Sequence, residues 1–134
     1  WYKNKIKKRP KFGVLGLNPH NAELRKVSEE KQIIIPAINK LKKIGISIGG
    51  PLVADTVFIK DFKKYDVIIG MYHDQVLTPL KTLYGFNAIN ITIGLPFIRI
   101  TVDHGPNNKM IGKNLSSPTS LIETLNFVKN LRDI

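Results

Sequence analysis

Short apolar runs recur along the chain and predict β-strands. The glycine-studded run FGVLGL, residues 12–17, predicts a buried strand that ends at the turn NPHN, residues 18–21. The run DVIIGM, residues 66–71, has the length and the branched side chains of a second buried strand. Residues 87–94 (NAINITIG) and 97–102 (FIRITV) predict two further strands.

Helical spacing of apolar residues appears first between Ser28 and Ile44. Acidic residues 29 and 30 suit the positive end of a helix dipole, and Gly45 is a natural stop. Pro36 lies inside this segment, where it removes one backbone hydrogen bond at a cost of about 3 kcal/mol, so we expect a kinked helix. The apolar face consists of Ile34, Ile38 and Leu41.

A second helix is predicted near the carboxyl end of the chain, over residues 116–131. Ser117 is suited to the N-cap and Pro118 to the first helical position. The expected apolar face consists of Leu121, Leu125, Val128 and Leu131.

Strands that alternate with helices predict an α/β fold with a partly parallel sheet flanked by helices. In open sheets of this kind, ligands bind beyond the carboxyl ends of the strands. His20 and His73 each follow a predicted strand end. No repeat or low-complexity tract divides the chain, so we expect a single domain over residues 1–134, with 1–11 as a basic connector or helix tail.

Composition adds a strong positive charge to this picture. The 134 residues carry 21 Lys and Arg against 10 Asp and Glu, a formal charge of +11, which favours anionic partners such as nucleic acid, a membrane surface or phosphorylated metabolites. Residues 3–11 hold much of the excess, which is typical of a solvated basic end. The chain has no cysteine and no apolar run of about 20 residues, so we expect a cytoplasmic protein without disulfides or membrane spans.

Candidate chemistry is limited to a few polar positions. Neither the G-x-G-x-x-G fingerprint nor a P-loop occurs, so any nucleotide must be held in another way. The three histidines, His20, His73 and His104, stand in turn-like contexts that could serve a metal, although a zinc-type site commonly needs three protein ligands. Three scattered positions could hold an anion or lie on solvated surface: Lys81, Asn90 and Arg99.

Five blocks of residues resemble one enzyme family. The segments GLNPH, GPLVADTVF, MYHDQ, NITIGLPFIR and VDHG occur in the order expected of 4-hydroxythreonine-4-phosphate dehydrogenase, an enzyme of pyridoxal phosphate biosynthesis. The resemblance runs from about Phe12 to the end of the chain. It implies that the chain is the C-terminal part of such an enzyme, less than half of it, and that this part alone would be inactive.

The resemblance also implies roles for individual residues. His20 and His73 would bind a divalent metal (Zn, Mg or Co), together with a ligand from upstream of Trp1. The substrate-binding positions of the family fall on Lys81, Asn90 and Arg99. The acids Asp55 and Asp74 would lie near the substrate, where either could act as the base.

The reaction implied is an oxidation followed by loss of carbon dioxide. NAD or NADP would take hydride from the secondary alcohol of 4-phosphooxy-threonine, and the resulting β-keto acid would decarboxylate to 3-amino-2-oxopropyl phosphate, with the metal on the alcohol oxygen. The family resembles isocitrate and isopropylmalate dehydrogenases, which bind the dinucleotide without a Rossmann fingerprint. A homodimer with a shared active site is therefore expected.

This sequence departs from the family pattern at several points. The usual HAGE reads HNAE here, and HDQG reads HDQV, changes that alter loop shape more than ligand chemistry. The loop of residues 103–114 is expected to approach the adenosine, with His104 and Lys109 as cofactor-binding residues, and Lys109 stands where an acid is more usual. A lysine could accept a 2′-phosphate, so the cofactor preference is expected to be relaxed toward NADP.

Two other functions compete with this reading. Close relatives oxidise phosphorylated sugar acids such as threonate or erythronate 4-phosphate, and no residue here securely reads the substrate amine. A domain of charge +11 could also bind nucleic acid, but few aromatic residues interleave with the basic ones and no binding motif is present. We therefore expect a phosphorylated small molecule as the partner, without nucleic acid or membrane.

Overall fold

The computed structural model describes residues 8–106 and 108–132, which form two compact units. The first unit comprises residues 8–79, and the second comprises the described residues from Leu80 onward. The expectation of one domain over residues 1–134 stays a prediction, and most of the expected basic connector, residues 1–7, lies outside the described part. Within that part, no helix is both long enough and apolar enough to cross a membrane.

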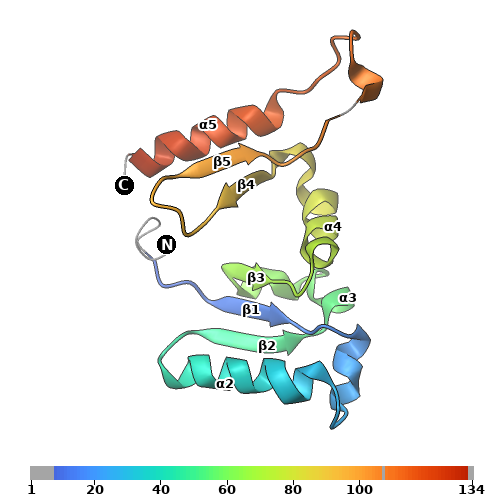
Figure 1. Ribbon diagram of the computed structural model, residues 1–134, viewed down its shortest axis with the longest axis vertical. Helices are drawn as coiled ribbons and strands as arrows, with labels where there is room; N and C mark the ends of the chain where they lie inside the picture. The colour runs from blue at the N-terminus through green and yellow to red at the C-terminus, as the bar shows by residue number, and fades with distance from the viewer. Residues whose placement is uncertain (1–7, 107, 133–134) are drawn as a thin grey trace. The chain divides into compact units, whose positions relative to one another are not determined.

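A parallel three-stranded sheet forms the centre of the first unit (Figure 1). Strand β1 (Phe12–Leu15) lies between β2 (Ile48–Leu52) and β3 (Val67–Ile69), with Phe12 opposite both Ile48 and Val67. The predicted strands at 12–17 and 66–71 are thus confirmed, although each is shorter than expected. Because all three strands run in parallel, their carboxyl ends lie at one edge of the sheet.

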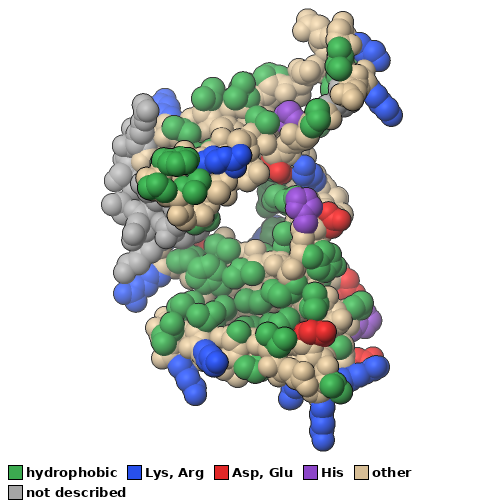
Figure 2. Space-filling view, viewed as in Figure 1, with side chains coloured by type: hydrophobic (Ala, Val, Ile, Leu, Met, Phe, Trp, Pro, Cys, Tyr) green, Lys and Arg blue, Asp and Glu red, His purple; other side chains and the backbone are tan. Residues whose placement is uncertain are grey.

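Helix α2 (Ile35–Lys43) packs on this sheet and completes the core. Val14 and Ile48 from the strands pack with Ile34 and Ile38 from the helical segment, and Phe12, Ile46 and Met71 border them. Lysines on the last turn of α2 face away from this core and suit the negative end of the helix dipole. Figure 2 shows hydrophobic side chains gathered over the sheet of this unit.

The expected kink at Pro36 takes the form of a change in helix type. A π-helical turn, η2 (Glu30–Ile34), precedes α2, and Pro36 lies in the first turn of α2. The helical segment is continuous at this point, since Ile34 has helical φ and ψ and the Ile35 N–H donates to the Glu30 carbonyl oxygen, and the widened turn lies just before Pro36, which has no N–H to donate. Ser28 marks the start of the segment, and its Oγ accepts a hydrogen bond from the Lys31 backbone N–H at 3.3 Å.

The turn after β1 is left-handed. In η1 (Pro19–Leu24), residues 20–24 have φ between 47° and 56°, a conformation that costs most L-residues about 1–2 kcal/mol each. Asn21, a residue type that tolerates this region, is buried and donates from Nδ2 to the Pro51 carbonyl at 3.0 Å. This contact ties the turn to β2.

The remaining elements of the first unit are short. Helix α3 (Ala54–Val57) follows β2, and η3 (Asp61–Lys64) leads to β3. Helix α4 (His73–Tyr84) starts just after β3 and continues into the second unit. His20 and His73 therefore both follow strands whose carboxyl ends share one edge of the sheet, as expected.

The second unit consists of an antiparallel strand pair covered by one helix (Figure 1). Strands β4 (Ile89–Thr92) and β5 (Arg99–Val102) confirm the two predicted strands. Short turns η4 (Gly85–Asn87) and η5 (Asn108–Met110) flank the pair, and α5 (Thr119–Arg132) packs on it. Buried Ser120 of α5 accepts from the Asp103 N–H and donates to the Ala88 carbonyl, so it holds both strands to the helix.

The predicted apolar face of α5 is only partly right. Val128 and Leu131 line a cavity of about 370 Å³ with Ile98, Ile100 and Thr124, so this end of the face does meet β5. Leu121 and Leu125 are 52% and 61% exposed, and the buried positions in those turns are Ser120 and Thr124. The helix starts at Thr119, one residue later than expected, and its N–H donates to Ser117 Oγ at 3.3 Å.

Candidate functional site

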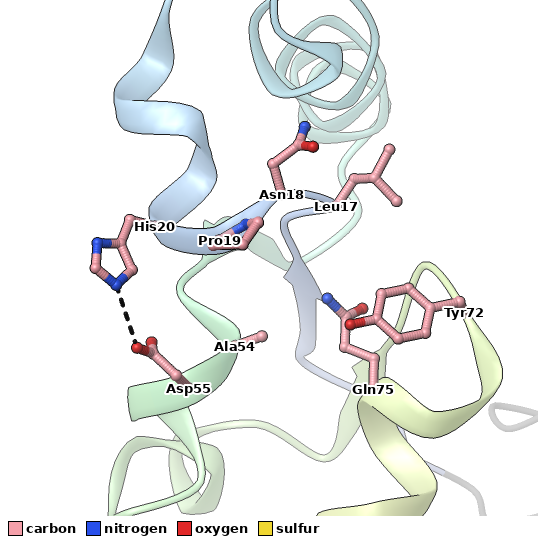
Figure 3. Close-up of a pocket in the computed structure, with 8 residues that line it drawn as sticks. All are labelled: Leu17, Asn18, Pro19, His20, Ala54, Asp55, Tyr72 and Gln75. Carbon is pink, nitrogen blue, oxygen red and sulfur yellow. Dashed lines mark ion pairs between the residues drawn. The ribbon is translucent and has the colours of Figure 1, made fainter.

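A pocket of about 320 Å³ lies in the first unit, among the loops that follow the parallel strands (Figure 3). The segment after β1 contributes His20, and α3 contributes Asp55. Tyr72, just before α4, and Gln75, in its first turn, complete the polar lining. The remaining lining residues are Leu17, Asn18, Pro19 and Ala54. The pocket is thus formed at the edge of the sheet where ligands of α/β proteins bind.

His20 and Asp55 face one another in this pocket (Figure 3). The His20 Nε2 and Asp55 Oδ2 atoms are 3.5 Å apart, and the side chains are 71% and 58% exposed. Two ligands of one tetrahedral ion with bonds of about 2.1 Å would be separated by about 3.4 Å. The pair therefore fits the chemistry and the spacing of a divalent-metal site, and a carboxylate here can equally orient the imidazole.

His73 and Asp74 open helix α4 and are both exposed. Tyr72 and Gln75, their neighbours on either side, line the pocket, whereas these two residues are not among its lining. Among the described residues no three His, Cys, Asp or Glu side chains are grouped so as to hold a metal. A complete site would therefore need a ligand from outside the described residues or a rearrangement of these side chains.

Glu30 supports the loop that carries His20, a role that the sequence analysis did not identify. Its carboxylate is fully buried and accepts hydrogen bonds from the backbone N–H groups of Leu17 and Asn18 at 2.9 and 2.7 Å. Burial by itself would raise the pKa of this carboxyl. The hydrogen bonds from the Asn18 backbone and side chain, with those from the N–H groups of Glu30 and Leu17, instead lower it from 4.5 to about 2.

Lys81 lies in the last turn of α4, in the second unit, and contacts Asp103. Its Nζ donates to the Asp103 carbonyl oxygen at 2.7 Å and lies 3.7 Å from Oδ2 of the same residue. Asp103, just past β5, was not anticipated as a partner. An ammonium group has three donors, so Lys81 keeps donors with which it could hold an anion.

Asn90 and Arg99 lie on the same face of the β4–β5 pair. Asn90 pairs with Thr101 and Thr92 pairs with Arg99, and side chains at these alternate positions share one face. The Arg99 Nη1 donates to Thr92 Oγ1 at 2.8 Å. The other face presents Ile100 toward α5, so the polar face lies away from that helix. The structure thus groups two of the three predicted substrate-binding residues on one surface.

The two residues predicted to bind the cofactor are exposed on the loop after β5. The His104 ring lies edge-on to the Phe86 ring, with centroids 6.3 Å apart. Lys109 lies in η5. Residue 107 of this loop is outside the described part.

Known proteins resemble the chain over nearly its whole length. The family model for the pyridoxal phosphate biosynthetic protein PdxA matches residues 2–128. A 4-hydroxythreonine-4-phosphate dehydrogenase from Sulfurihydrogenibium sp. (strain YO3AOP1) is 44% identical over 127 residues, which cover 94% of this chain and 39% of that protein. A protein from Oceanobacillus iheyensis, provisionally named a D-threonate 4-phosphate dehydrogenase, is 45% identical and is matched over 88% of this chain and 36% of its own length.

Solved structures agree with this comparison. The crystal structure of a 4-hydroxythreonine-4-phosphate dehydrogenase from Klebsiella pneumoniae matches with a TM-score of 0.80 at 33% identity, over 97% of this chain and 40% of that one. The chain thus spans about 40% of the length of the relatives that it matches. With a family match across most of its residues, the chain belongs to the PdxA family of pyridoxal phosphate biosynthetic proteins.

Proposed function

We propose that the full-length protein containing this chain is an NAD(P)- and metal-dependent dehydrogenase of pyridoxal phosphate biosynthesis. Its substrate would be 4-phosphooxy-L-threonine, and its product a β-keto acid that decarboxylates to 3-amino-2-oxopropyl phosphate. The observation that carries this proposal is the pocket at the carboxyl ends of the parallel strands, where His20 faces Asp55, in a chain of this family.

His20 and His73 would hold the divalent metal, Zn, Mg or Co, with a further ligand from outside this chain. Both histidines are exposed at the same edge of the sheet, and Asp55 adds an oxygen donor beside His20. When bound, the ion would stabilise negative charge on the substrate alcohol oxygen, and the dinucleotide would accept the hydride.

The chain's own acids would manage the proton of the alcohol. Oxidation of a secondary alcohol releases one hydride and one proton, so a base must stand near the hydroxyl group. Asp55 lines the pocket with His20, whereas Asp74 is exposed and outside the lining. For this reason we assign to Asp55 the role of the base that accepts the hydroxyl proton, and we assign no proton transfer to Asp74.

Lys81, Asn90 and Arg99 would bind the substrate and its phosphate group. Thr92 orients Arg99, and Asp103 orients Lys81. Because these contacts already restrict both long side chains, less conformational entropy is lost when the anion binds. The formal charge of +11 favours the approach of such a substrate. A homodimer with a shared active site and a cytoplasmic location complete the proposal.

A second candidate is the oxidation of a phosphorylated sugar acid. The relative from Oceanobacillus iheyensis, named for D-threonate 4-phosphate, is as similar to this chain as the 4-hydroxythreonine-4-phosphate dehydrogenases. The two substrate classes differ in the amino group. No described residue of the pocket is a carboxylate other than Asp55, so this chain offers little by which to select the amine.

The experiment that separates these candidates compares substrates in the full-length protein. NAD and NADP reduction would be followed with 4-phosphooxy-threonine, threonate 4-phosphate and erythronate 4-phosphate, each with a divalent metal. We expect the amino substrate to give the highest kcat/KM. Turnover of the sugar acids alone would support the second candidate function. The description of the fold and the pocket would be unchanged.

A further inference from the structure

Gln75 connects two loops through its buried amide group. Its Nε2 donates to the Gly16 carbonyl oxygen at 2.7 Å, and its Oε1 accepts from the Met71 backbone N–H at 2.7 Å. The side chain is 9% exposed and borders the pocket, with its amide beside the carboxyl end of β1 (Figure 3). Because both ends of the amide are used, the side chain is fixed in one orientation.

These two bonds lie where the backbone pairing of the sheet stops. Strands β1 and β3 pair through Phe12 and Val67, Gly13 and Ile68, and lastly Val14 and Ile69. Gly16 and Met71 follow two residues beyond that last pair. The Gln75 amide therefore supplies the link between the two segments that the backbone ladder no longer provides.

Each linked segment leads directly to one of the histidines assigned to the metal. His20 comes four residues after Gly16, and His73 comes two residues after Met71. A Cβ atom at Gly16 would overlap the Asn21 side chain, so the backbone at this point is closely packed. The intervening residues Leu17 and Asn18 are also held, by the buried Glu30 carboxylate. The loops are thus fixed, while the histidine side chains remain exposed.

We infer that Gln75 is a positioning residue that sets the separation of the His20 and His73 segments for metal binding. This inference rests on the metal site proposed above, and it concerns affinity for the ion more than folding. Groups hydrogen-bonded to metal-ligating side chains commonly change metal affinity by about 10- to 100-fold when they are replaced. Gln75 acts through the backbone of both segments, so we expect an effect at the lower end of that range.

The test uses three variants of the full-length protein. Gln75→Glu keeps the length and an acceptor for Met71 N–H, but it has no N–H to donate to the Gly16 carbonyl. Gln75→Leu removes both bonds at similar volume. Gln32→Leu is the matched control, since Gln32 is the other glutamine of the chain and lies exposed in η2. Titration with Co²⁺ measures affinity, and its visible absorption spectrum reports the ligand geometry.

The expected result is a Co²⁺ dissociation constant about 10-fold higher in Gln75→Glu, with an altered spectrum and no change in the control. Circular dichroism and thermal unfolding identify the folded fraction, and Gln75→Glu keeps the test readable if Gln75→Leu does not fold. Folded Gln75→Glu with wild-type affinity and spectrum would overturn the inference, because the glutamine would then be merely structural.

The outcome for the proposed reaction is judged separately, by turnover of the wild-type protein. If the wild type binds Co²⁺ but does not oxidise 4-phosphooxy-threonine, the reaction is wrong and the Gln75 result still stands on affinity. If the wild type binds no Co²⁺, the metal site and the positioning role both fail.

Discussion

The Glu30 carboxylate accepts a hydrogen bond of 2.7 Å from the Asn18 backbone N–H, two residues before His20. Glu30→Gln should lower the free energy of unfolding by about 2 kcal/mol at pH 7, because the amide keeps one acceptor oxygen but loses the charge that strengthens these bonds, and its NH2 group would face the Asn18 Nδ2 donor. The neighbouring Glu29 accepts from Asn18 Nδ2 at 2.7 Å in an exposed position, where Glu29→Gln keeps an acceptor, so that change should lower the free energy of unfolding by no more than about 0.5 kcal/mol.

The effect of Glu30 should depend on pH in one direction. Its pKa falls from 4.5 to about 2 on folding, so its contribution is complete above about pH 4.5 and is lost as the pH falls toward 2. Denaturant unfolding of wild type and Glu30→Gln at several pH values measures this. The difference between the proteins should shrink below pH 4.5, and a constant difference down to pH 2 would contradict the assignment.

Ala22 occupies a left-handed conformation, with φ at 47°. Ala22→Gly should therefore raise the melting temperature, corresponding to about 1 kcal/mol, because glycine adopts this region without a steric penalty. Ala37→Gly, at an exposed position within the right-handed helix α2, should have the opposite effect and cost about 1 kcal/mol. Destabilisation by both changes would show that the turn is not left-handed in solution.

The three histidines should separate into two classes when metal binding is measured. His20→Ala and His73→Ala should each weaken Zn²⁺ or Co²⁺ binding by at least about 100-fold, as a direct ligand is lost. His104→Ala should bind the ion like the wild type, since His104 contacts Phe86 in the second unit. Unchanged affinity in both of the first two variants would remove the metal assignment.

The two candidate acids can be distinguished by kinetics. Asp55→Asn should lower kcat by about 10²- to 10⁴-fold and remove the acid limb of the pH–rate profile, as expected for loss of a general base. Asp74→Asn should retain that limb and lose much less activity. The reverse pattern would assign the proton to Asp74.

Cofactor preference should respond to Lys109. A lysine near the adenosine would pair with a 2′-phosphate, so the wild type should use NADP as well as NAD, and Lys109→Glu should shift the ratio of kcat/KM values toward NAD. Steady-state kinetics with both dinucleotides measure the ratio. A strong NAD preference in the wild type would show that Lys109 does not contact the cofactor in this way.

Local patterns predicted much of the fold. Strands β1, β3, β4 and β5 coincide with apolar runs that are typical of strands. Pro36 predicted an irregular helix, and the structure has a π-helical turn just before it. The exposed Leu121 and Leu125 could not be foreseen, because periodicity identifies an apolar face without showing how much of it a small strand pair can cover.

Site residues that stand in family motifs could be predicted from the sequence. Residues whose role depends on tertiary contacts could not. The motifs identified both His20 and Asp55, but only the structure shows that the two side chains are in contact. Glu30 was interpreted as a helix-dipole acid, although its main partners are 12 and 13 residues away in the chain. Gln75 belongs to the motif MYHDQ, but the sequence predicted no role for it. Its two hydrogen-bond partners lie on segments that only the parallel pairing of β1 and β3 brings together.

The most direct test of the proposed function is the stoichiometry of the reaction in the full-length protein. Reduced dinucleotide and carbon dioxide would be measured together with 4-phosphooxy-threonine as substrate, in the wild type and in His20→Ala. We expect one carbon dioxide for each dinucleotide reduced, and little of either from His20→Ala. Reduction without carbon dioxide, or undiminished turnover in His20→Ala, would contradict the proposed function.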